Sequence, residues 1–154
     1  MAIGEIALRV NGARGAGVLK GGVWSHRGGD RPADWGAYLL AETPAAQLRW
    51  TQTVIFCQAG ASPPSASSVP YYLAAGVDFQ GLLPSRPADH LVAGFARAWL
   101  RELPDGSETS WEITYILHLS PSLSIQPDLQ YIVHPGGRYP NALAVLIRLG
   151  VRLH

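Results

Sequence analysis

The feature that most constrains this sequence is the strict alternation of apolar and polar residues in its last third. Between residues 123 and 131 the polar positions are Ser124, Gln126, Asp128 and Gln130, and the positions between them are apolar, apart from a proline at 127. Successive side chains of a strand point to opposite faces, so a period of two predicts a strand with one wet face and one apolar face. The segments 109–119 and 142–153 repeat the pattern. Ile113 and Leu117 lie opposite Glu112 in the first, and an unbroken apolar row that includes Val145, Ile147 and Leu149 lies opposite Arg148 and Arg152 in the second.

Turn residues divide the chain at near-regular intervals and predict an all-β fold. We expect strands at 4–11, 17–26, 35–42, 48–59, 70–79, 90–101, 109–119, 123–133 and 142–153. The segments between them, "TPAAQ" at 43–47 included, are rich in the residues that turns require. Because a proline inside a strand removes a ladder hydrogen bond, we expect a local bulge at Pro127. We interpret Arg86 and Asp89 in "PSRPAD" as a pair that stabilises a turn.

Composition is compatible with two surroundings for the apolar faces of the strands, a protein core or a lipid bilayer. Hydrophobic residues make up 47% of the 154 residues and charged residues 15%, against about 25% charged in ordinary soluble domains. No apolar run approaches the ~18 residues of a membrane-spanning helix, whereas several expected strands have the ~9–11 residues of a membrane-spanning strand. A net charge of +1 with scattered arginines gives no support for a nucleic-acid partner.

No pattern supports an enzyme, a metal or a cofactor. Cys57 is the single cysteine, and the five histidines show no metal-type spacing. "GARGAGVLKGG" lacks the lysine and hydroxyl residue that follow the last glycine of a phosphate-binding loop. The N-terminus lacks a basic first segment, and Glu5 interrupts its apolar stretch, so no signal peptide is predicted. We therefore predict no catalytic residue, no metal ligand and no cofactor.

Loop lengths favour an up-and-down meander with two unlike ends. If consecutive strands pair, the longer loops gather at one end and the short turns mostly at the other, as in outer-membrane barrels. The same arrangement places Tyr71, Trp99, Trp111 and Tyr131 near the long-loop end, like an interfacial aromatic belt. We expect the loops around Ser65 and Gly137 on the cell exterior, and Ser122 and His154 on the periplasmic side.

The segment "ETSWEITYILHLSPSLSIQPDLQYIVHPGG", residues 108–137, resembles the C-terminal signature of the carbohydrate-selective porins of the OprB family. "GVLKGGVWSH", "WGAYLLAE" and "VDFQGLLPSRPADHLVAGFA" resemble earlier motifs of that family, in the same order. The resemblance implies an antiparallel up-and-down transmembrane β-barrel in the Gram-negative outer membrane, through which sugars diffuse. Its partners would be sugars, bound weakly, and outer-membrane lipid.

The chain departs from the family in two ways. It has about nine expected strands, roughly half of the number in full-length relatives, and it ends at His154 rather than at an aromatic residue. We therefore expect residues 1–154 to be a single domain, the C-terminal portion of an OprB-type barrel. The missing N-terminal half or a second copy of the chain would complete the wall.

The polar positions of the strands are the candidate lining of the sugar path. Arginine, lysine and glutamine donate hydrogen bonds, and the carboxylates and glutamine accept them, which suits hydroxyl-rich, uncharged sugars. We expect the path to be lined by Lys20, Arg49, Asp78, Glu112, Gln126, Asp128, Gln130, Arg148 and Arg152. The alternative function is a soluble periplasmic or secreted β-sandwich that binds carbohydrate on a polar face.

Overall fold

The computed structural model describes residues 1–13, 15–26, 34–48, 50–63, 67–101, 103 and 106–152. The nine strands are β1 (Ala2–Gly12), β2 (Gly15–His26), β3 (Asp34–Leu48), β4 (Thr51–Ala61), β5 (Tyr71–Gln80), β6 (His90–Trp99), β7 (Ser107–Ser120), β8 (Leu123–Val133) and β9 (Ala142–Val151). A 3-10 turn, η1 (Pro135–Gly137), precedes β9. Within these ranges, no helix is long and apolar enough to cross a membrane.

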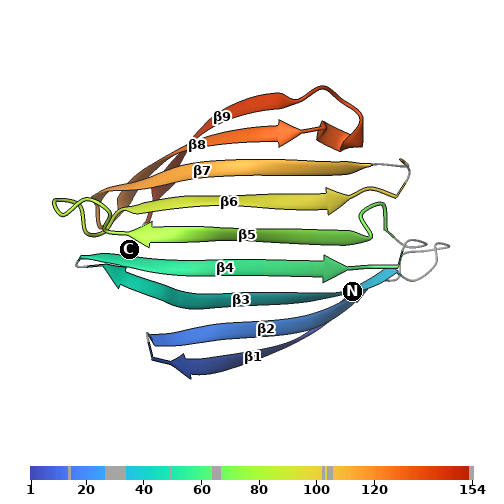
Figure 1. Ribbon diagram of the computed structural model, residues 1–154, viewed down its shortest axis with the longest axis horizontal. Helices are drawn as coiled ribbons and strands as arrows, with labels where there is room; N and C mark the ends of the chain where they lie inside the picture. Colours follow the sequence, from blue (N-terminus) through green and yellow to red (C-terminus); the bar gives the residue numbers. More distant parts are fainter. Residues whose placement is uncertain are drawn as a thin grey trace.

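All nine strands belong to one sheet and follow one another in chain order, each antiparallel to its neighbours (Figure 1). The up-and-down meander predicted from the sequence is thus confirmed. Among the described residues there is no second sheet to pack on the first, so the β-sandwich alternative is wrong. No ladder joins β1 to β9 within these residues, and the sheet is open along both strands.

One expected loop is a strand. The "TPAAQ" segment was predicted as a connection, but β3 continues through it to Leu48 and pairs with β4. The register shifts between Pro44 and Ala46, which marks a bulge. A bulge tolerates a residue without an N–H donor, so a proline here interrupts the ladder without ending the strand.

The prediction of a bulge at Pro127 is wrong. Thr114 pairs with Asp128 and Leu117 with Ile125 in the same register, so β8 passes through the proline without a shift. The pairs between them are absent from the β7–β8 ladder, because proline has no N–H to donate. The Thr114 hydroxyl donates to the Pro127 carbonyl at 3.0 Å instead, and the register shift of this hairpin lies near its turn, between His118 and Ser120.

Burial in this sheet is the reverse of that in a soluble protein. Among the described residues, Ala74 is the one buried hydrophobic residue, while Thr51, Asp89, Thr114 and Asp128 are buried polar residues. Large apolar side chains stand exposed, Ile147 at 76% and Val145 at 71%. A contiguous exposed apolar surface of this extent requires an apolar environment or a partner.

Candidate functional site: the polar face of the sheet

Strand register divides the side chains into two faces. The polar face carries Glu5, Lys20, Tyr38, Gln58, Tyr72, Asp78, His90, Glu112, Thr114, Gln126, Asp128, Gln130 and Arg148. The apolar face carries Ile6, Leu8, Leu19, Val23, Leu39, Ile55, Leu73, Val77, Phe95, Trp111, Ile113, Leu129, Tyr131, Leu143, Val145, Ile147 and Leu149. Most strand residues with polar side chains therefore lie on one face, which also carries apolar residues such as Leu40, Phe56 and Leu146, while the other face is predominantly apolar.

The residues predicted to line a sugar path share one face wherever a ladder includes them. Lys20, Asp78, Glu112, Gln126, Asp128, Gln130 and Arg148 all lie on the polar face. Arg152 lies one residue beyond β9, where its backbone N–H donates to the Ser122 carbonyl at 2.9 Å. Arg49 lies outside the described residues.

Five of these residues meet on β7, β8 and β9. Glu112 lies opposite Gln130, and Gln126 lies opposite Arg148. Gln130 Nε2 donates to Glu112 at 3.3 Å, Arg148 Nη1 donates to Gln126 Oε1 at 3.3 Å, and Gln126 Nε2 donates to the Thr114 hydroxyl at 3.1 Å. With Asp128 and Thr114, these residues form what we name the β7–β9 polar cluster.

Asp128 lies at the centre of this cluster. Its side chain is 7% exposed, and its Oδ1 atom has no hydrogen-bond partner within the described part of the protein. A cavity of about 140 Å³ beside it is lined by Gln126, Leu146, Ile147 and Arg148. A buried acceptor without a donor is costly, so this oxygen is a position at which a hydroxyl of water or of a solute is favoured.

Two further polar pairs occupy the polar face. His90 Nδ1 lies 3.0 Å from both carboxylate oxygens of Asp78, across the β5–β6 hairpin. Lys20 Nζ lies 3.8 Å from Glu5 Oε1, across the β1–β2 hairpin. Lys20 and Asp78 therefore lie on the same face as the β7–β9 polar cluster but on other strands, and each has its own partner.

Several residues of the polar face were missed in the sequence. Glu5, Tyr38 and Tyr72 face the same side as Lys20, and Thr114 lies inside the cluster. These residues could have been found from the odd or even position of each one along its strand, here called its parity. Parity assigns faces within a strand, but the faces of different strands can be matched only when the register between them is known.

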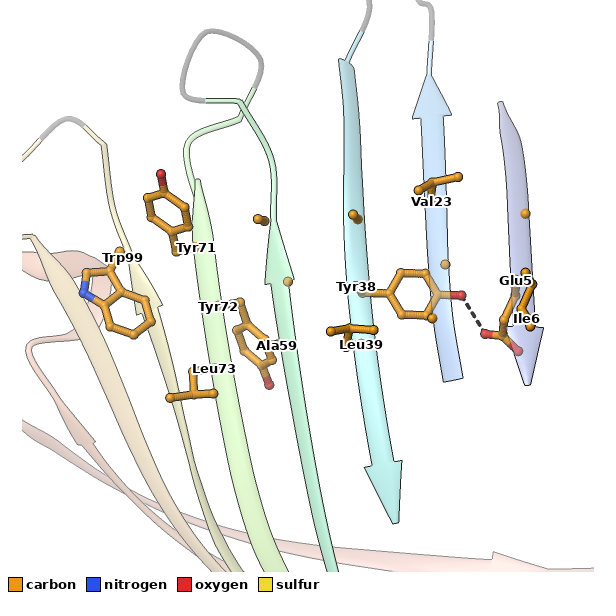
Figure 2. A pocket seen from close by; sticks show the side chains of 16 residues that line it. Glu5, Ile6, Val23, Tyr38, Leu39, Ala59, Tyr71, Tyr72, Leu73 and Trp99 are labelled. Atoms are coloured by element: carbon orange, nitrogen blue, oxygen red, sulfur yellow. Dashed lines mark hydrogen bonds between the residues drawn. The ribbon is translucent and has the colours of Figure 1, made fainter. Parts of the chain in front are cut away.

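The apolar face is hollowed where glycine and alanine replace larger residues. A depression of about 1040 Å³ runs across β1 to β6. Figure 2 shows the surrounding side chains of Val23, Leu39, Leu73, Tyr71 and Trp99. Small residues such as Gly21 and Ala59 form its floor.

The aromatic residues predicted to form a belt lie on the apolar face. Tyr71 pairs with Trp99 at the end of the β5–β6 hairpin nearer to the long loops, and Trp111 pairs with Tyr131 further along. The Tyr131 hydroxyl accepts from Asn141 Nδ2 at 2.9 Å, so the ring keeps its polar tip toward the loop that precedes β9. Rings with an apolar body and a polar tip are typical of membrane interfaces.

At the opposite end of the sheet, the buried carboxylate of Asp89 in the β5–β6 turn links this turn to β7. Asp89 is 3% exposed and pairs with Arg86, as predicted for this turn. It also accepts from the Tyr115 hydroxyl and from the His118 backbone N–H, both at 2.9 Å. The hydrogen bond from Arg86, followed by those from His118 and Tyr115, outweighs burial and lowers the pKa of Asp89 from 3.8 to about 2.

The polar face is suited to reversible hydrogen bonding. It offers carboxylates that accept, a lysine and an arginine that donate, and glutamines that do both. Among the described residues, no group of three or more histidine, cysteine or acidic side chains is placed to hold a metal ion. The lone Cys57 is exposed on the apolar face.

Comparisons with known proteins agree on one family. Residues 12–154 match the family described as carbohydrate-selective porin, OprB family. A solved structure, titled "High pH structure of Pseudomonas putida OprB", superposes with a TM-score of 0.72 at 18% sequence identity, covering 90% of this chain and 49% of that one. The chain thus spans about half the length of the porin it matches. No match was found among curated proteins. With a family match over nearly its whole length and a porin fold, the chain belongs to the OprB family of carbohydrate-selective porins.

Proposed function

We propose that this sheet is part of the wall of an outer-membrane channel through which sugars diffuse. One observation carries the proposal: the sheltered face of the sheet is polar, and the exposed face is apolar. In a channel the polar face borders water and the apolar face borders lipid, so both are in favourable surroundings. We infer sugars as the solute because the family is described as carbohydrate-selective.

The proposed lining consists of the predicted residues of the polar face. The β7–β9 polar cluster offers alternating donors and acceptors, and the Asp128 oxygen without a partner is an acceptor available to a sugar hydroxyl. Most of these side chains remain partly exposed to solvent. Each sugar contact would therefore replace a contact with water at little net gain, and the solute would leave as readily as it enters.

Closure of the wall requires more strands. Nine alternating strands leave β1 and β9 running in the same direction, so they could meet only in parallel. An added set with an odd number of strands would give antiparallel seams on both sides. We propose that residues 1–154 act as one domain, the C-terminal portion of an OprB-type barrel, and that an N-terminal set of strands or a further copy of the chain completes it.

The proposed location is the outer membrane of a Gram-negative cell, with lipid against the apolar face. The depression across β1 to β6 and the aromatic pairs Tyr71–Trp99 and Trp111–Tyr131 would all face lipid. A channel of this kind needs no cofactor and no covalent chemistry, so we propose no enzyme activity.

The test is sugar uptake by cells from which the gene has been deleted. Uptake is measured at sugar concentrations low enough for outer-membrane permeation to limit the rate. We expect slower uptake after deletion, recovery when the gene is restored, and partial recovery with the Arg148→Glu variant. The Val145→Ala variant, changed on the apolar face, is the matched control and should restore uptake fully. Unchanged uptake after deletion would contradict the proposal.

A further inference from the structure

Two aromatic side chains on the polar face cover glycines of the neighbouring strand. Trp24 of β2 pairs with Gly36 of β3, and Gly22 of β2 pairs with Tyr38 of β3. A Cβ placed on Gly36 would lie 2.7 to 2.8 Å from Nε1, Cε2 and Cζ2 of Trp24. A Cβ placed on Gly22 would meet Oη and Cε1 of Tyr38 at 2.5 and 2.6 Å, with Cζ between them.

These distances give the orientation of the rings. Each point is nearly equidistant from three bonded atoms of a planar side chain and further from them than the radius of the circle through those atoms, so it lies out of the plane of the side chain. Gly22 therefore lies beneath the hydroxyl end of Tyr38 and Gly36 beneath the Nε1–Cζ2 edge of Trp24, as in aromatic coverage of strand glycines. Both rings are partly exposed, so the opposite ring face is open to the aqueous side of the sheet.

Hydrogen bonds hold the tyrosines in this arrangement. Tyr38 Oη donates to Glu5 Oε2 at 2.6 Å, and Figure 2 shows the ring extended from β3 across β2 toward Glu5 on β1. Tyr72 follows in the same row, separated from Tyr38 by Gly60, and its hydroxyl accepts from Gln58 Nε2 at 3.0 Å. We name Trp24, Tyr38 and Tyr72 the aromatic platform.

A charged pair borders the aromatic platform. Glu5 accepts from Tyr38 with one oxygen, and its other oxygen lies 3.8 Å from Lys20 Nζ. The two side chains are 40% and 41% exposed, so each keeps hydrogen-bonding capacity toward solvent. An open aromatic face and a donor–acceptor pair thus lie side by side.

We propose that the aromatic platform stacks against pyranose rings and that Glu5 and Lys20 bind the hydroxyls at the ring edge. This inference rests on the proposed sugar channel and specifies where, and by which chemistry, it recognises its solute. One face of a pyranose presents C–H groups, which carry partial positive charge and are attracted to the negative face of an aromatic ring. An open-chain polyol has the same hydroxyls but no rigid ring face.

The experiment is saturation-transfer NMR on the full chain refolded in detergent, with methyl β-D-glucopyranoside as the probe and sorbitol as the open-chain control. Stacking predicts that saturation reaches mainly the C–H hydrogens of one sugar face. Tyr38→Leu keeps an apolar side chain but removes the ring, and we expect binding about three- to tenfold weaker. Tyr38→Phe keeps the ring and should bind the glucoside nearly as the unchanged protein does. Tyr131→Leu, on the apolar face, should have no effect.

The outcomes separate this inference from the proposed function. Equal saturation of glucoside and sorbitol, or equal losses in Tyr38→Leu and Tyr38→Phe, would overturn the stacking inference. If gene deletion still slows sugar uptake, the proposed channel stands without the aromatic platform. A second reporter allows for a folding defect in the tyrosine variants. In a variant that keeps Trp24 and has phenylalanine at positions 35, 50, 99 and 111, the glucoside should alter the tryptophan fluorescence and sorbitol should not. No change with either solute would also overturn the inference.

Discussion

The hydroxyl of Tyr115 donates a hydrogen bond to the Asp89 carboxylate at 2.9 Å and thereby ties β7 to the turn between β5 and β6. Arg86 and the His118 backbone N–H complete the shell around the buried carboxylate. Asp89→Asn removes the charge that faces Arg86 and leaves buried donors poorly matched. We expect it to lower the free energy of unfolding by about 1–3 kcal/mol, measured by urea unfolding in detergent. Ser85→Ala, in the same turn and exposed, is the control and should change little.

The same carboxylate predicts a dependence of stability on pH. The pKa of Asp89 is about 2 in the folded chain, below its ordinary value of 3.8. The unfolded chain therefore takes up this proton at a higher pH than the folded chain does. The stabilisation is complete above about pH 4 and is lost as the pH falls toward 2. The difference in unfolding free energy between the unchanged protein and Asp89→Asn should shrink over this range. A difference independent of pH would show that the charge of Asp89 is not what stabilises the turn.

Adjacent residues of β9 should respond differently to the same substitution. Ile147 lies on the apolar face and Leu146 on the polar face, and both are exposed. An arginine facing the middle of a bilayer costs about 2–4 kcal/mol, so Ile147→Arg should destabilise the protein in vesicles by about that amount. Leu146→Arg should cost much less, since its charge meets water. Equal costs for the two variants would show that the faces do not meet different solvents.

Orientation in the membrane can be tested by labelling cysteines on intact cells. The structure places the turn at Ser122 and the loop at Gly137 at opposite ends of β8. Ser65 and His154, which belong to the same prediction, lie outside the described residues. Gly137 has a φ of +71°, so the exposed neighbour Arg138 is a better position for the cysteine. In a Cys57→Ala background, we expect a membrane-impermeant reagent to label Arg138→Cys and not Ser122→Cys. The reverse pattern would mean the opposite orientation.

The chain alone should not form a sugar-selective channel. Unpaired backbone groups along β1 and β9 each cost several kcal/mol in hydrocarbon, which favours association with further strands over an open sheet. After refolding of the purified chain, planar-bilayer recordings should lack discrete openings that a sugar closes. Regular unitary conductances blocked by sugar would show that the chain closes into a pore by itself.

The sequence predicted the faces well because alternation is local information. The register of β7, β8 and β9 confirms the two faces expected from parity alone. Ile113, Val145 and Leu149 lie on one face, and Glu112 and Arg148 lie on the other. Whether the first set meets lipid remains a prediction. The pairing of Arg86 with Asp89, three residues apart, was also within reach of the sequence.

Contacts between distant strands were not predictable in the same way. Tyr38 reaches Glu5 across 33 residues, and Tyr115 reaches Asp89 across 26. The first contact depends on the register of two hairpins and the second on the register of β6 and β7, and a shift of one residue in any of them would turn a partner to the other face. The extension of β3 past Pro44 was missed for a related reason, because a bulge depends on pairing with β4 and leaves no mark in the alternation.

The central claim is that one face of this sheet meets lipid and the other meets water, and a spin-label scan along β7 tests it most directly. Single cysteines are placed at positions 109–119 in a Cys57→Ala background, labelled with a nitroxide and studied in lipid vesicles. Collisions with oxygen, which concentrates in lipid, should peak at Trp111, Ile113 and Leu117. Collisions with a water-soluble nickel complex should peak at Glu112 and Thr114 on the other face. High nickel accessibility at Ile113, or the absence of a period of two, would contradict the account.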